Sequence, residues 1–244
     1  MLKVFALAFC AIAIISFAPA PSYALVVTGY ITADNDLWVW NGSAWDASGA
    51  QSTNWTSADS LTFDINPGET KTLYFAVKNE GGNSTLNPTG FLATFTIGGG
   101  VFNQSLSPVL SSGVANWRVL GISPDETGLF PSNVLNPAGL SGWSEPAWYA
   151  KNSFGSGSVN PTYASVVDPD NNDGSVWYDY LGGAVSGIDG DAEWISTADN
   201  FEEGGDDYTI FSVDLTAAAV PEPASVAMFG LGLLGLFGLR RKKA

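Results

Sequence analysis

Residues 71–78 read Lys-Thr-Leu-Tyr-Phe-Ala-Val-Lys, and residues 91–97 read Phe-Leu-Ala-Thr-Phe-Thr-Ile. Apolar side chains recur at every second position in both stretches, which is typical of a β-strand with one buried face. A third stretch, residues 208–215, shows the same period. The residues expected on the buried faces are Leu73, Phe75, Val77, Phe91, Ala93, Phe95, Ile97, Phe211, Val213 and Leu215.

Turn-forming residues separate these strands, as in Asn66-Pro67-Gly68, Gly81-Gly82-Asn83 and Gly98-Gly99-Gly100. No long stretch between residues 25 and 219 has the apolar spacing of a helix. We therefore expect an all-β fold, a β-sandwich or jelly roll, formed by one domain over residues 25–219. Residues 124–173 are rich in Gly, Ser, Pro and Asn and predict long surface loops.

Charge is distributed very unevenly along the 244 residues. Of the nine Lys and Arg, only Lys71, Lys78, Arg118 and Lys151 lie between residues 25 and 219, against 23 of the 24 acidic residues. Four basic and 23 acidic residues give this domain a formal charge of −19. Such a surface repels phosphate backbones, which excludes nucleic acid as a partner.

The types of catalytic residue are restricted as well. The chain has no histidine, and its single cysteine, Cys10, lies in an apolar leader, so thiolate and histidine-based chemistry are excluded. The remaining catalytic options are an Asp/Glu pair of the glycosidase type and a Ser/Lys arrangement. No spacing singles out such a pair, and we expect the protein not to be an enzyme, with a secreted carbohydrate-active hydrolase as the alternative.

The N-terminus is typical of a secretory signal peptide over residues 1–24. Lys3 gives a positive start, residues 4–17 are apolar, and small residues and prolines follow. Cleavage is expected between Ala24 and Leu25. An uncleaved anchor helix is less consistent with a short run that Pro19 and Pro21 interrupt.

The C-terminus carries three features in order. Pro221-Glu222-Pro223 is followed by the uncharged, glycine-containing residues 224–239, and then by Arg240-Arg241-Lys242-Lys243. Sixteen helical residues span roughly 24 Å, close to the hydrocarbon core of about 30 Å, so residues 224–239 predict a transmembrane helix. The basic cluster acts as a membrane stop on the cytoplasmic side, which leaves the N-terminal part of the chain outside.

This order of features over residues 220–244 resembles the PEP-CTERM sorting tail of exopolysaccharide-forming Gram-negative bacteria. The resemblance implies an exosortase partner that processes the chain near residues 221–223. It also implies export through the secretory translocon, transient anchoring in the inner membrane, and delivery to the cell surface or extracellular matrix. An ordinary single-pass anchor without processing is the alternative.

Two shorter stretches, residues 29–40 and 192–195, resemble terminal strands of galactose-binding-like jelly rolls. That resemblance implies a glycan-binding type of fold and names no ligand residue. Within the first stretch, Trp38 and Trp40 are two positions apart and would point to the same side of a strand, where flat rings could form a sugar platform. The alternative for each ring is burial in the core.

Metal binding has one main candidate, the segment from Asp168 to Gly174. Asp168, Asp170, Asn172 and Asp173 supply the carboxylate and amide oxygens that calcium prefers. The spacing departs from an EF-hand, because Gly174 is one position late and Asp179 stands where a glutamate is expected. A calcium loop and a plain solvated turn are both open at this point.

Two smaller acidic groups are weaker candidates for an ion site. They are Asp34 with Asp36, and the alternating set Asp189, Asp191 and Glu193. Each set is equally consistent with a solvated surface. The sequence as a whole predicts an exported, non-enzymatic structural or glycan-binding component of the exopolysaccharide layer.

Overall fold

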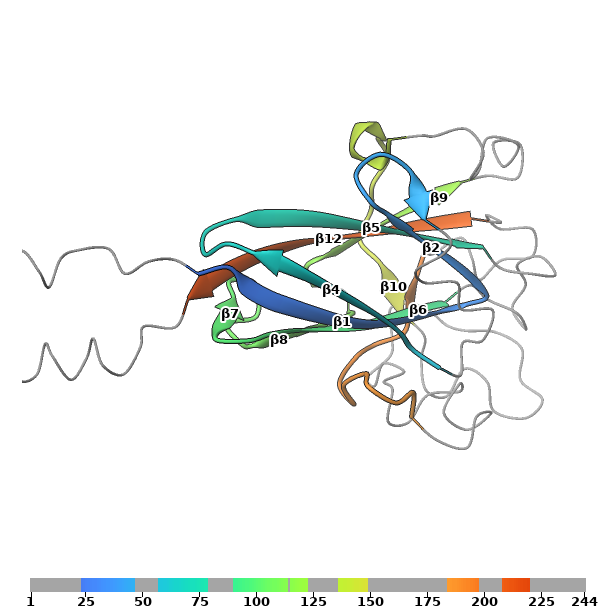
Figure 1. Cartoon of the computed structure of the whole chain (residues 1–244). Coiled ribbons are helices and arrows are strands. Elements are labelled where there is room, and N and C mark those ends of the chain that lie inside the picture. The colour runs from blue at the N-terminus through green and yellow to red at the C-terminus, as the bar shows by residue number, and fades with distance from the viewer. Residues whose placement is uncertain are drawn as a thin grey trace, which may run out of the picture.

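A computed structural model describes residues 23–46, 57–78, 90–113, 115–122, 136–148, 184–197 and 208–219. These residues form two antiparallel sheets that face each other (Figure 1). Sheet 1 contains β1 (Leu25–Asp34), β4 (Asp59–Ile65), β6 (Gly90–Ile97), β8 (Val109–Ser111), β10 (Ala147–Trp148) and β11 (Ile195–Ser196). Sheet 2 contains β2 (Asp36–Trp40), β3 (Trp45–Asp46), β5 (Thr70–Lys78), β7 (Gly100–Phe102), β9 (Trp117–Ile122) and β12 (Tyr208–Ala219). The all-β prediction and the sandwich are confirmed, whereas the jelly roll stays a prediction.

The strand order is β10-β11-β6-β1-β4 in sheet 1 and β3-β2-β5-β12-β7 in sheet 2. β8 also pairs with β6, and β9 also pairs with β12. Successive strands mostly belong to opposite sheets, so the chain crosses between layers repeatedly. One crossing is the turn Asn66-Pro67-Gly68-Glu69, where the amide of Glu69 donates to the carbonyl of Asn66 at 2.9 Å. Gly68 has φ +82°, as the third position of a type II turn requires.

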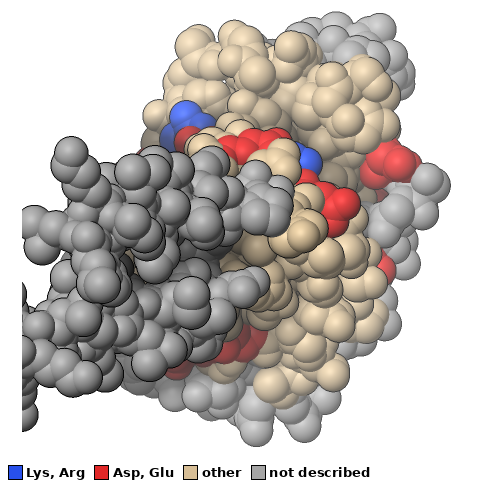
Figure 2. All heavy atoms as spheres, turned by 60° about the vertical axis from the view of Figure 1, so that its left-hand side comes forward, with Lys and Arg blue, Asp and Glu red and all other residues tan. Residues whose placement is uncertain are grey.

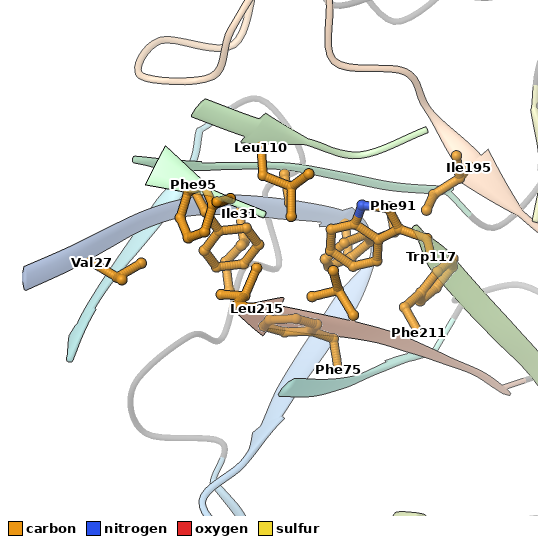
Figure 3. Close-up of a cluster of buried hydrophobic side chains, with 14 of the residues drawn as sticks. Val27, Ile31, Phe75, Phe91, Phe95, Leu110, Trp117, Ile195, Phe211 and Leu215 are labelled. Atoms are coloured by element: carbon orange, nitrogen blue, oxygen red, sulfur yellow. The ribbon is translucent and has the colours of Figure 1, made fainter. Parts of the chain in front are cut away.

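The core lies between the sheets and is built from the faces that the period-two pattern predicts. Phe75 of β5, Phe91 of β6 and Phe211 of β12 are fully buried there, with ring centroids of Phe91 and Phe211 4.7 Å apart (Figure 3). Trp117 joins them, 5.3 Å from Phe91. Burying each such ring stabilises the fold by about 1.5–3 kcal/mol. Gly29 of β1 makes room for Phe95, because a Cβ there would lie 2.6 Å from the Phe95 ring.

Some strand boundaries differ from the prediction. β12 continues four residues past Leu215, because Ala217, Ala218 and Ala219 pair with Phe102, Val101 and Gly100 of β7. The predicted strand over residues 29–40 is two strands, β1 and β2, which separate at Asn35 and enter different sheets. Residues 192–195 contribute only Ile195 to β11.

The start of β1 and the end of β12 lie at the same end of the sandwich (Figure 1). A Cβ on Gly100 would lie 2.6 Å from Leu25 and 2.9 Å from the carbonyl oxygen of Ala218, so both chain segments meet there. Ala217 is held on its other side by the turn, because the Gly68 amide donates to its carbonyl at 2.7 Å. The strand that leads to the C-terminal tail is therefore paired up to its last residue.

Candidate functional site: a groove on the outer face of sheet 2

The edge of β12 that faces β9 and β7 has an interruption. β9 pairs with residues 208–213 and β7 with residues 217–219, which leaves residues 214–216 between them. Gln104 fills the gap with its side chain: its Nε2 donates to the carbonyl of Asp214 at 2.7 Å, and its Oε1 accepts from the amide of Thr216 at 3.3 Å. One amide side chain thus replaces a strand partner and keeps β12 hydrogen-bonded.

A groove of about 630 Å³ opens beside this interruption. The residues that line it come from four separate segments of the chain. They are Gln104, Ala115, Asn116, Trp117, Arg118, Trp143, Ser144, Glu145 and Asp214. Most of these side chains are polar, and three are charged.

An ion pair joins the two strands within the groove. Nη2 of Arg118 on β9 lies 3.8 Å from Oδ2 of Asp214 on β12, and each side chain is 48% exposed. The hydroxyl of Thr72 donates to Oδ1 of Asp214 at 2.5 Å, which fixes the carboxylate. An exposed pair of this kind contributes at most about 1 kcal/mol to stability, so its main effect is to orient donor and acceptor atoms in the groove.

Trp143 forms the aromatic side of the groove. Its indole Nε1 donates to the carbonyl of Leu140 at 3.1 Å, and its ring lies 5.9 Å from the ring of Tyr74. The guanidinium of Arg118 lies 5.6 Å from the Trp143 ring centroid, a cation–π contact. Burial raises the pKa of the Tyr74 phenol above its ordinary value.

Glu145 is positioned at the groove by its neighbour in the chain. Ser144 pairs with Val119 of β9 through two backbone hydrogen bonds of 2.9 and 3.0 Å.

The two tryptophans that the sequence offers as a candidate platform lie elsewhere on sheet 2. Trp38 is only 8% exposed and belongs to a second apolar cluster with Ala76, Ile122, Tyr208 and Ile210. Its burial argues against a platform role. Trp40 is half-buried and meets Trp45 edge to face, with ring centroids 5.3 Å apart.

The other candidate sites give no metal centre within the described part of the chain, where no group of three His, Cys, Asp or Glu could hold an ion. Asp189 accepts a hydrogen bond from the Asp191 amide at 2.9 Å, the pattern of a local turn. The calcium candidate Asp168, Asp170, Asn172 and Asp173 lies outside the described residues, as do the signal peptide up to residue 22 and the tail from residue 220. The helices described here include none long and apolar enough to cross a membrane.

Sequence reasoning did not identify the groove, because its residues are scattered between positions 104 and 214. One signal was available: Arg118 is one of only four basic residues in a strongly acidic domain. Trp143 and Gln104 carried no comparable signal, since their roles depend on which strands become neighbours.

The described residues form an all-β domain with a polar, aromatic-sided groove, carried on a chain with a sorting tail. The tail is matched by the family model of the PEP-CTERM protein-sorting motif over residues 219–242, which confirms the resemblance seen in the sequence. No curated protein matches the chain, and no solved structure matches its fold. The motif indicates an exported protein that is membrane-anchored during sorting, with an exosortase as processing partner.

Proposed function

We propose that this protein is a non-enzymatic component of an extracellular polysaccharide layer, which binds glycan through the groove on sheet 2. The observation that carries the proposal is the cluster of Trp143, Arg118 and Asp214 in one open groove. Sugar-binding surfaces need an apolar ring beside fixed hydrogen-bonding groups, and these three residues supply both. The sorting motif supports this role, because it indicates an exported protein, and the layer that we propose lies outside the cell.

The binding proposal is tested by screening the protein on a glycan array, with Trp143→Ala as the matched variant. We expect the wild-type protein to bind a subset of glycans and the variant to lose that signal. A wild-type protein that binds no glycan would exclude the proposal.

The sorting proposal is tested separately. Replacing Pro221, Glu222 and Pro223 by alanine in a host with an exosortase should leave an unprocessed chain in the inner membrane. The readouts are the mass of the mature chain and its location in cell fractions. An unchanged mass and surface location would show that the motif does not direct processing here.

A secreted hydrolase is the second candidate, because Glu145 and Asp214 line the same groove. Glycoside hydrolysis uses two carboxyl groups that flank the bond to be cleaved. In this groove Asp214 is already occupied by Thr72 and Arg118, which favours binding over catalysis. Release of reducing ends by the wild-type protein, and its loss in Glu145→Gln, would establish the hydrolase instead.

A further inference from the structure

The charges of the groove restrict which glycan it can hold. Arg118 is the only basic residue among the described residues that line it, and Asp214 compensates its charge at 3.8 Å. Glu145 adds a third charge, so the described lining has a formal charge of −1 within a domain of −19. Figure 2 shows acidic side chains over more of the described surface than basic ones on the face it displays.

The other basic residues that the structure describes are engaged away from the groove. Lys71 donates to the carbonyl of Asp64 at 2.6 Å and lies over the Phe63 ring. Lys78 lies 6.0 Å from the Tyr208 ring centroid. None of the described residues therefore gives a polymer of uronate or sulfate groups a cationic track to follow, and the field of the domain opposes its approach.

The hydrogen-bonding groups of the groove match hydroxyl groups. A guanidinium only donates and a carboxylate only accepts, whereas a sugar hydroxyl does both. Arg118 beside Asp214 offers one partner of each kind a few ångströms apart, and Asn116 and Ser144 can supply either. Gln104 is a positioning residue, since its amide is used to hold β12 in place.

From these observations, and resting on the proposed glycan binding, we propose that the groove takes an uncharged, hydroxyl-rich glycan segment. One sugar ring packs against Trp143, and neighbouring hydroxyls bridge Arg118 and Asp214. A hydroxyl pair satisfies both groups, whereas a carboxylate placed at this pair offers no donor to Asp214 and an ammonium placed there offers no acceptor to Arg118.

The test uses the full chain purified in a zwitterionic detergent that carries no sugar. Three polymers of matched length are titrated in the presence of a chelator: a neutral glucan, a uronate polymer and a partly deacetylated amino-sugar polymer. We expect the neutral glucan to bind most tightly, with a Kd that changes by less than about twofold between low and high salt. Trp143→Ala should weaken it at least about tenfold.

Two further variants separate the outcomes. Glu145→Gln should raise the affinity for the uronate polymer relative to that for the neutral glucan, because it removes the uncompensated charge of the groove. Trp40→Ala should leave binding unchanged, and a loss there with none in Trp143→Ala would place the ligand at β2–β3 and overturn the groove assignment. Tighter binding of either charged polymer would overturn the neutral class alone. Failure of all three polymers would overturn the glycan-binding function itself.

Discussion

The described residues cover the two outer faces of the sandwich in different ways, and the difference locates the proposed glycan site. On sheet 1, residues 184–194 pack closely: the amide of Asp189 donates to the Thr94 hydroxyl at 3.0 Å, and Leu92 is fully buried. On sheet 2, residues 136–146 cover only part of the face. Among the described residues, the groove lies open beside Trp143 and the interruption in the β12 edge.

The cover of sheet 1 therefore stabilises the fold, whereas the incompletely covered face of sheet 2 holds the proposed glycan site. In sheet 1 the cover contributes buried apolar area, with Trp194 and Ala192 fully buried. In sheet 2 the same kind of segment holds Trp143 and Glu145 at an edge where they remain accessible. Substitutions in the two covers should separate stability from binding.

The largest effect is expected at the sealed face. Trp194→Ala removes a fully buried ring and should lower the free energy of unfolding by about 3–5 kcal/mol. Denaturant unfolding followed by tryptophan fluorescence measures this change. A loss below 1 kcal/mol would mean that the cover of sheet 1 packs loosely, and the contrast between the faces would disappear.

The tightness of packing under the two covers can be compared at Gly187 and Gly142, which have nearly equal φ angles. Gly187 over sheet 1 has φ +90°, and a Cβ there would lie 2.8 Å from the Tyr30 ring; Gly142 over sheet 2 has φ +92°, with Leu120 at 3.4 Å. Both alanine variants carry the strain of a positive φ, of about 1–2 kcal/mol. Gly187→Ala should cost about 1–2 kcal/mol more than Gly142→Ala, because only the first also meets a ring. Equal losses would show equally tight packing.

At the open face the expected balance is reversed. Trp143→Ala removes the contacts with Tyr74 and Arg118 and should cost about 1–2 kcal/mol of stability, less than Trp194→Ala. Its effect on glycan affinity should exceed its effect on folding. Thermal unfolding and glycan titration of the same preparation give both numbers. A variant that binds normally would remove Trp143 from the site.

The smallest effect is expected at the turn Asn66–Glu69, which lies under neither cover. The amide and side chain of Asn66 hydrogen-bond to the Glu69 carboxylate and lower its pKa below the ordinary 4.5. Because the folded pKa is the lower one, this contribution is present above the unfolded value and is lost as pH falls through the folded value. The difference in unfolding midpoint between wild type and Glu69→Gln should be positive at neutral pH and vanish once the pH is below the lowered pKa of the folded state. A difference independent of pH would contradict the assignment.

How much the sequence predicts differs between these regions for a physical reason. The faces of β5, β6 and β12 follow from a period of two over contiguous residues, so Phe75, Phe91 and Phe211 were correctly placed in the core. The sorting tail is likewise contiguous. The groove depends on long-range pairing. Arg118 meets Asp214 because β9 pairs with β12, and Gln104 reaches β12 because β7, just before it in the chain, pairs with residues 217–219. A single sequence does not encode such neighbours in its local pattern. For Trp38 the sequence leaves platform and core both open, and the residues that bury it, such as Ile122 and Tyr208, lie far away in the chain.

The most direct test of glycan binding in the groove is hydrogen–deuterium exchange of the full chain, with and without a saturating neutral glucan oligosaccharide. If the glycan occupies the groove, exchange slows in peptides that contain residues 103–118 and 140–146 and does not change in residues 184–197. Protection confined to residues 184–197, or to β2 and β3, would contradict it.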